Sequence, residues 1–250
     1  MSATTALYNP YIFAGPIQNP ADFYGRNAQL RDVFECIRKS ACVNLVGDRR
    51  SGKTSLLFHL RHFDIQKQYL ANPRDYVFVY LDGQLMPADP AGFYRELLLA
   101  IKEQCPDLAL PVDETAADER LVRRFLDAMR PRRLVLLVDE FECISLNQDY
   151  PARFFVFLRG LSICYNISFI VASRQRLTEC CSRDVVTSPF PNIFRPCEIG
   201  PFTLDEFDQF IVKSAAPSGA PISQVRDEIL KMAGLYPYLV QAACWHFYRA

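Results

Sequence analysis

Residues 47–54 read GDRRSGKT and fit the pattern G-x-x-x-x-G-K-[ST]. They follow a short apolar run at residues 42–46 and precede a stretch with helical spacing, which is the context that such a loop requires. Glycines let consecutive backbone N–H groups turn toward one anion, and the N-terminus of the next helix adds partial positive charge. The segment therefore predicts a loop that holds the phosphates of a nucleotide.

Two side chains of this loop have separate expected roles. Lys53 is expected to reach the β- and γ-phosphates and to serve catalysis, and the Thr54 hydroxyl is expected to ligate Mg²⁺. We expect the Arg49 and Arg50 side chains to contact solvent or a partner, and we assign them no catalytic role. We predict ATP or ADP with Mg²⁺ as the ligands. The other expected nucleotide contacts of the loop are Gly47, Arg50, Ser51, Gly52 and Ser55.

Two carboxylates directly follow the apolar run of residues 134–138, in the Walker B arrangement. Ligands of doubly wound sheets bind at the carboxyl ends of the strands, so we expect both carboxylates beside the phosphates. Asp139 would hold the hydrated Mg²⁺, and Glu140 would orient or deprotonate the attacking water. The alternative is a solvated pair of loop carboxylates, which the nearby phosphate loop disfavours.

A cation follows another apolar run, at residues 167–172. Ser173 and Arg174 end this run, which places a guanidinium at the same edge of the sheet. A guanidinium there could report whether the γ-phosphate is present. Arginines are common after strands, so an ordinary surface position is the alternative.

These residues need a scaffold in which strands and helices alternate. Because parallel strands require crossover connections, we expect an α/β fold with a doubly wound, parallel, five-stranded sheet. Beyond Pro201 the strand signals stop, and Thr203 with Glu206 forms a capping box that opens a small helical lid. Apolar runs predict strands at 42–46, 76–81, 134–138, 167–172 and 194–199, and helical spacing predicts helices at 27–40, 54–63, 93–104, 150–164, 224–232 and 238–248, with another opening near Thr115 and Asp118.

The same signals divide the chain into three parts. We expect an extended N-terminal arm at residues 1–24, a P-loop nucleotide-binding core at 25–200 and a helical lid at 201–250. Prolines and a lack of periodic apolar positions favour an arm over a helix at the start. The last amphipathic pattern stops without a C-cap, which predicts that the lid is truncated and that a sensor or effector domain follows residue 250.

Composition narrows the class of protein. The 28 basic and 28 acidic side chains give a formal net charge of zero, which disfavours extended nucleic-acid binding. The nine cysteines form no C-x-x-C pair, so we expect reduced thiols, among which Cys36, Cys42, Cys143, Cys164 and Cys244 are interpreted as core residues. No signal peptide or 18-residue apolar run is present in the sequence, which predicts a soluble, cytoplasmic protein without a membrane partner.

The phosphate loop, the segment LVLLVDE and the segment IVASR together resemble the AAA+ and STAND branch of P-loop ATPases, including origin-recognition-like and bacterial STAND-type domains. Residues 15–26, which end in Phe-Tyr-Gly-Arg, look like the F-x-G-R entry segment of these proteins, and residues 234–237 are similar to the G-x-x-P motif of the STAND lid. The resemblance implies that Arg174 senses the γ-phosphate and that Arg26 and Pro237 contact the adenine side. Asn27 departs from the acidic residue common at that position.

The resemblance implies a molecular switch that binds ATP, hydrolyses it slowly and self-associates through the ATPase domain, in signalling or defence regulation. The alternative is a DNA-handling AAA+ ATPase of the replication-initiator or transposition-helper type. A scaffold that does not hydrolyse nucleotide is disfavoured by Glu140, and a small-molecule kinase by the apolar helical C-terminal part. The basic residues that could contact DNA are Arg120, Arg123, Arg124, Arg130, Arg132 and Arg133. They could equally form the solvated face of one helix and the segment that leaves it.

Overall fold

The computed structural model describes residues 9, 11–108, 117–181, 189–218 and 222–249, and it contains a five-stranded sheet in the order β2-β3-β4-β1-β5. All four neighbouring pairs are parallel. This confirms the predicted sheet, with strand ends that lie within one residue of the expected ones. The strands are β1 (Cys42–Val46), β2 (Tyr76–Asp82), β3 (Arg133–Asp139), β4 (Ser168–Ser173) and β5 (Phe194–Glu198).

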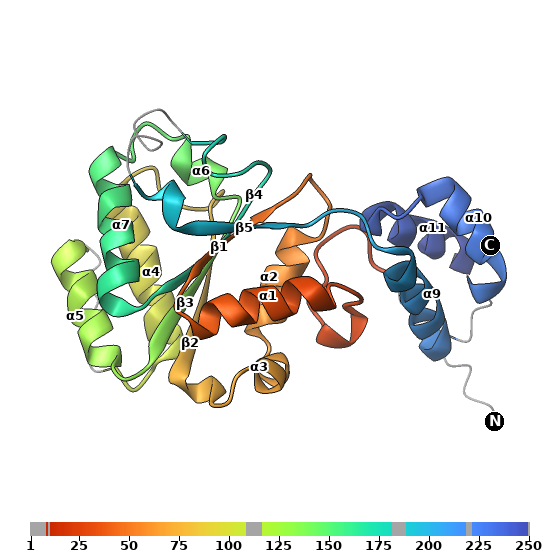
Figure 1. The fold of residues 1–250 in the computed structure, drawn as a ribbon, viewed down its shortest axis with the longest axis horizontal. Coiled ribbons are helices and arrows are strands. Elements are labelled where there is room, and N and C mark those ends of the chain that lie inside the picture. The colour runs from red at the N-terminus through yellow and green to blue at the C-terminus, as the bar shows by residue number, and fades with distance from the viewer. Residues whose placement is uncertain (1–8, 10, 109–116, 182–188, 219–221, 250) are drawn as a thin grey trace, which may run out of the picture.

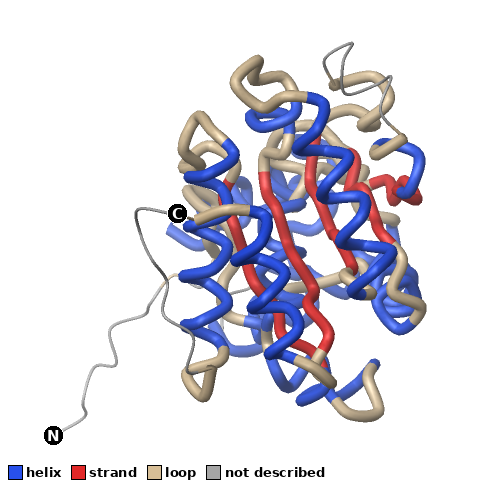
Figure 2. Tube along the Cα trace, turned by 90° about the vertical axis from the view of Figure 1, so that its left-hand side faces the viewer, coloured by secondary structure: helices blue, strands red, loops and turns tan. Residues whose placement is uncertain are grey.

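Helices cover both faces of the sheet (Figures 1 and 2). One face carries α4 (Pro90–Gln104), α5 (Glu119–Met129) and α7 (Ala152–Tyr165), and the other carries α1 (Asn27–Arg38), α2 (Lys53–Arg61) and α3 (Phe63–Tyr69). The short α6 (Glu142–Ser145) follows the carboxyl end of β3. Short 3₁₀ turns complete the core at Pro20–Asp22, Pro73–Asp75 and Pro191–Ile193.

Side chains of each central strand divide between two apolar cores. Leu136 and Val138 of β3 pack with α4, α5 and α7, whereas Val135 and Leu137 pack with α1 and α2. This alternation follows from the two-residue period of a strand, and burial on both faces explains why the strands read as continuous apolar runs. The two cores fix the carboxyl ends of the strands, where the predicted site lies.

The helix predicted for residues 54–63 is divided in the structure. α2 ends at Arg61 because His62 takes an extended conformation, and α3 begins at Phe63. The buried Gln66 side chain donates hydrogen bonds to the carbonyls of Leu60 (3.0 Å) and Arg61 (3.1 Å), which caps the end of α2. Helical spacing alone does not reveal this capping contact, so the prediction missed the break.

The C-terminal helices form a separate apolar cluster. Thr203 and Glu206 make the predicted capping box, with hydrogen bonds of 2.9 and 3.2 Å between their side chains and backbone N–H groups. The buried Tyr11 of the arm belongs to this cluster. The three-part division of the chain stays a proposal. The cluster is built from α9 (Leu204–Ser218), a 3₁₀ turn at Ile222–Val225, α10 (Arg226–Ala233) and α11 (Pro237–Arg249) (Figure 1).

The expectation of core positions for two cysteines is wrong, whereas the expected start of a helix near Asp118 is confirmed. Cys143 and Cys164 are exposed rather than core residues, because they lie on the outer faces of α6 and α7. The N-cap of α5 is Asp118, whose side chain accepts a hydrogen bond from the Leu121 N–H (2.7 Å), while Thr115 lies outside the described residues. Among the helices that the structure describes, none has the length and apolar character needed to cross a membrane.

Candidate nucleotide site

The phosphate loop joins β1 to α2 at the carboxyl edge of the sheet. Gly52 precedes α2 with a φ of 101°, a conformation that side chains rarely adopt. A Cβ atom on Gly47 would lie 2.3 Å from the carbonyl oxygen of Ile199, the residue that follows β5. Only glycine therefore fits at position 47 without a shift of the backbone. Both glycines of the motif therefore have a steric reason in this fold.

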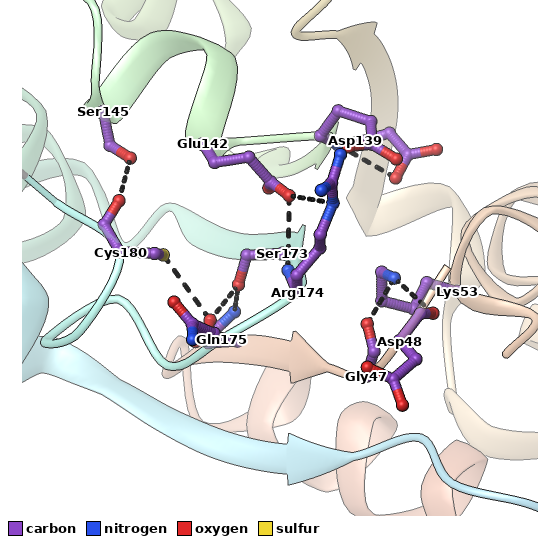
Figure 3. A network of polar contacts seen from close by, with 12 residues as sticks. Gly47, Asp48, Lys53, Asp139, Glu142, Ser145, Ser173, Arg174, Gln175 and Cys180 are labelled. Carbon is purple, nitrogen blue, oxygen red and sulfur yellow. Dashed lines mark hydrogen bonds and ion pairs between the residues drawn. The ribbon is translucent and has the colours of Figure 1, made fainter. Parts of the chain in front are cut away.

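The Lys53 ammonium group lies within the curve of the loop. Its Nζ atom donates to the carbonyl oxygens of Gly47 (2.6 Å) and Asp48 (3.0 Å), as Figure 3 shows. Burial lowers the pKa of Lys53, and the negative charge of Glu140 opposes that shift. The structure thus holds a buried cation where the sequence predicts the phosphate contact.

The two predicted metal ligands are in direct contact. The Thr54 hydroxyl donates to Asp139 Oδ2 (2.6 Å), although the residues come from α2 and β3. Asp139 is buried, and desolvation raises its pKa while the bond from Thr54 acts in the opposite direction. A hydroxyl and a carboxylate are oxygen donors of the kind that Mg²⁺ prefers, so these residues fit that ion.

Glu140 follows Asp139 with a φ of 43°, which is uncommon for a residue other than glycine. Its backbone N–H donates to Asp139 Oδ1 (3.0 Å), and the N–H of Gly83, after β2, donates to the Asp139 carbonyl (2.9 Å). These contacts fix the backbone on both sides of the acidic pair. Glu140 is half-buried and lines the cavity described below.

Gly83→Ala should disturb this acidic pair. The added Cβ would lie 2.5 Å from the Glu140 carbonyl oxygen and 2.7 Å from that of Asp139, so the backbone must shift. We expect the free energy of unfolding to fall by about 1–3 kcal/mol and ATP turnover to fall with it. Denaturant titration and a phosphate-release assay measure both. Gly160→Ala is the control, because nothing lies within 4 Å of its Cβ; equal stability of the two variants would contradict the prediction.

Arg174 stands at the end of β4, as predicted, but pairs with Glu142. Its Nε atom lies 3.5 Å from Glu142 Oε1, and its backbone N–H donates to the same oxygen (3.3 Å) (Figure 3). The Arg174 side chain is half-exposed, and it is absent from the described lining of the nucleotide cavity. A sensor role for Arg174 stays a proposal and would require the side chain to leave Glu142.

A buried polar network, missed at the sequence level, fixes the turn that carries Arg174. The Asn44 amide in the central strand β1 donates to the Ser173 hydroxyl (2.7 Å), and its Oδ1 accepts from the Leu177 N–H (3.1 Å). Ser173 in turn donates to the Gln175 carbonyl (2.6 Å), as Figure 3 shows. An asparagine inside an apolar run is the signal that could have indicated this network.

A cavity of about 440 Å³ lies beside the phosphate loop. The hydroxyl of Ser51, which lines it, is buried and has no hydrogen-bond partner among the described residues, which fits a missing polar ligand. Ile12, Phe13 and Pro16 of the arm supply an apolar wall. The cavity holds most of the predicted contacts, namely Arg26, Arg50, Ser51, Gly52, Lys53, Thr54, Ser55, Glu140 and Pro237; it also holds Gln84, Tyr238 and Gln241, which the sequence reasoning missed.

Lid residues contact the loop directly. The Tyr236 hydroxyl donates to the Arg49 carbonyl (3.0 Å), and the Arg50 guanidinium lies 4.1 Å from the ring centroid of Tyr238. These contacts place Pro237, between the two tyrosines, at the cavity. The Arg50 side chain thus packs within the chain, whereas the contact of Arg49 is made by its backbone and leaves the prediction for its side chain as a prediction.

Arg26 connects three segments. It is 4% exposed, and its guanidinium donates to the carbonyls of Ser51 (3.2 Å), Gly200 (2.5 Å) and Pro201 (3.3 Å). Its backbone N–H donates to the Glu206 side chain, so an acidic residue of α9 lies beside Arg26. Burial lowers the pKa of Arg26, and the charge of Glu206 opposes the shift. Arg26 therefore ties the loop to the start of the lid.

The entry segment also contacts α2 through a buried histidine. Phe23 stacks on His59 with ring centroids 4.1 Å apart, and His59 Nδ1 has no partner among the described residues. Burial lowers the pKa of His59 from 6.5 to about 4. The unfolded chain therefore binds a proton at a higher pH than the folded chain.

Stability should consequently be complete above about pH 6.5 and should decline as the pH falls toward 4. The single histidine accounts for a loss of about 3 kcal/mol. Denaturant titrations at pH 7 and pH 4.5 would measure it. His59→Phe, which keeps the stacked ring but cannot titrate, should flatten this part of the profile; an unchanged slope in that variant would contradict the assignment.

Comparisons with known proteins place this geometry in a family. The family model described as Novel STAND NTPase 2 matches residues 38–249. No curated protein matches the chain. Among solved structures, the Walker-type ATPase of Pyrococcus abyssi superposes with a TM-score of 0.70 at 16% identity, over 94% of this chain and 71% of that one.

Two origin-recognition proteins of Aeropyrum pernix share the fold. The ORC2 protein in its ADP form gives a TM-score of 0.61 at 13% identity, over 87% of this chain and 59% of that one. The ORC1 protein in complex with DNA gives 0.55 at 13% identity, over 89% and 60%. The chain thus spans less than two thirds of either ORC protein. With most of its length matched by the family model, the chain belongs to the Novel STAND NTPase 2 family of P-loop NTPases.

Proposed function

We propose that this NTPase is a switch that binds ATP with Mg²⁺, hydrolyses it slowly and transmits the state of the nucleotide to its helical lid. The observation that carries the proposal is the composition of the 440 Å³ cavity, since the arm, the phosphate loop, Glu140 and the lid all line it. In the proposed switch these parts of the chain move relative to one another, and a ligand in the cavity touches all of them. Its presence therefore biases their arrangement.

The site residues divide the work of hydrolysis. The loop backbone, Ser51 and Lys53 would bind the phosphates, and Thr54 with Asp139 would hold Mg²⁺, which when bound neutralises phosphate charge. Glu140 would orient a water molecule and accept its proton. Ile12, Phe13 and Pro237 offer an apolar wall for the base. These roles are proposals that rest on position and residue type.

Transmission to the lid would pass through Arg26. Its guanidinium contacts the Ser51 carbonyl within the loop and the carbonyls of Gly200 and Pro201 at the start of the lid. A change of the loop on nucleotide binding alters the first of these contacts. Because a buried guanidinium needs its acceptors, the segment around Gly200 must adjust as well. That adjustment would in turn change self-association and the state of a downstream effector.

Amide hydrogen exchange tests the switch. With ATP and with ADP bound, we expect different protection of residues 200–206, and phosphate release slower than the enzyme median of about 10 s⁻¹. Arg26→Gln should reduce the difference in protection, whereas Arg31→Gln, an exposed change on α1, should leave it intact. Equal protection with ATP and with ADP bound would contradict the proposed switch. An absence of phosphate release would contradict the proposed ATPase activity.

The DNA-handling alternative is less well supported by the charges. Of its candidate arginines, Arg123 pairs with Glu119, Arg130 with Asp127 and Arg132 with Asp107. These carboxylates neutralise three of the arginines that would have to contact the DNA phosphates. The ORC1 protein of similar fold is in complex with DNA, so salt-dependent binding of duplex DNA by this chain would revive the alternative.

A further inference from the structure

A second cavity, of about 980 Å³, runs along the outer edge of the sheet at β2. Tyr76, Val77, Phe78 and Tyr80 of β2 line it, together with residues from α2, α3 and the 3₁₀ turn before β2. It shares no lining residue with the nucleotide cavity. We call this cavity the edge groove; the proposed ATPase makes no use of it.

The edge groove follows a strand with one free side. In the part of the chain that the structure describes, β2 pairs with β3 alone and ends the sheet order. An edge strand presents unpaired N–H and C=O groups, which can accept a further strand. With seven residues, β2 is long enough to pair with an extended peptide segment.

Charge in the edge groove has one sign. Among the described residues that line it are Arg61, Arg74, Arg132 and His62, with no aspartate or glutamate. Asp107 neutralises Arg132 through two hydrogen bonds of 3.1 and 2.8 Å. Arg61 and Arg74 are exposed and have no carboxylate partner among the described residues. Within the described part of the chain, two cations without a carboxylate partner therefore flank the open strand.

Aromatic side chains complete the surface. The Arg61 guanidinium lies 5.4 Å from the ring centroid of Tyr80 and 5.9 Å from that of Phe58, which holds the cation over the edge groove. Phe63 lines the same space and is 47% exposed, so its ring is available to a ligand. A ligand of the edge groove thus meets apolar rings between two positive charges.

We propose that the edge groove binds an extended acidic peptide segment of a partner protein, which adds to β2 as a strand and places carboxylates at Arg61 and Arg74. Backbone pairing along β2 favours a peptide, because a nucleic-acid strand has no alternating N–H and C=O groups to offer. Two unpaired arginines are also few for a phosphate backbone. Alternate side chains of the added strand would face Phe63 and Tyr80.

Fluorescence anisotropy with a labelled eight-residue peptide of alternating Glu and Val tests this proposal. We expect the peptide to bind more tightly than its Lys–Val counterpart and more tightly than an oligothymidylate. Arg61→Glu combined with Arg74→Glu should weaken binding about tenfold or more. The matched control is Arg120→Glu with Arg124→Glu, which makes the same change in net charge on the exposed face of α5.

Three results would overturn the proposal: equal loss in both double variants, preference for the oligonucleotide, or no binding of the acidic peptide to the wild-type chain. Arg74→Gln, an exposed change in a 3₁₀ turn, provides a milder variant if the double reversal does not fold, and it should weaken binding as well. Lys53→Ala should leave peptide binding unchanged. The groove and the proposed ATPase can therefore fail separately.

Discussion

Glu140→Gln should leave ATP bound and slow its hydrolysis by about 10²- to 10⁴-fold, the usual cost of removing a general base. In free energy of activation this is about 3–5 kcal/mol. The substitution keeps the size of the side chain and, because the N–H of residue 140 still donates to Asp139 Oδ1, the local backbone. Single-turnover phosphate release together with retention of labelled ATP would measure the two effects.

Glu103→Gln serves as the control for that experiment, since this exposed residue of α4 lies outside the nucleotide cavity. Its turnover should equal that of the wild type. Normal hydrolysis in Glu140→Gln would show that another group activates the water. The described cavity lining also contains Asp22, which could accept a proton, and Gln84, which could orient the water, so Asp22→Asn and Gln84→Ala variants would examine the two.

Lys53→Ala should weaken ATP binding and abolish turnover. The ammonium is buried and lies within the loop, so its loss removes a charge-assisted contact to phosphate of about 1.5–3 kcal/mol, or about 10- to 100-fold in affinity. It also removes the Lys53 hydrogen bond to the Gly47 carbonyl, whereas the Asp48 carbonyl still accepts from the Ser51 N–H (3.3 Å). Titration with a fluorescent ATP analogue measures the affinity.

Lys67→Ala, an exposed lysine of α3, is the matched control and should bind ATP as the wild type does. A thermal melt of both variants separates a local loss of affinity from a loss of folding. Unchanged ATP affinity in a folded Lys53→Ala protein would defeat the assignment of the phosphate site.

The sheet and the phosphate loop could be predicted because their signals are local. Strands β1, β3 and β4 are almost entirely buried, so they read as largely apolar runs, whereas the edge strand β5 is mostly exposed; the ends of all five strands lie within one residue of the predicted ones. The loop between Val46 and Lys53 is defined by glycines with steric reasons of their own. Thr54 and Asp139 meet because parallel strands bring their carboxyl ends to one edge of the sheet.

Contacts that depend on the packing of distant segments could not be predicted in this way. No pattern pairs Arg26 with the Gly200 carbonyl, or the Arg50 guanidinium with the ring of Tyr238. The salt bridge from Arg174 to Glu142 depends on the short α6, which is too brief to show helical periodicity. Such contacts arise from tertiary structure, and they decide how the site is connected to the lid.

The arm has a mechanical consequence for the lid. At one end the Asn9 amide donates to the Trp245 carbonyl of α11, and at the other the Ile17 N–H donates to the Ser55 hydroxyl of α2. The chain also crosses between the two bodies directly after β5 (Figure 1). Together with the contacts that Glu206, Tyr236 and Tyr238 make with the core, these links join the two bodies at several points around the nucleotide cavity. A body held at several points cannot swivel freely, so any displacement of the lid must break or lengthen at least one of these contacts.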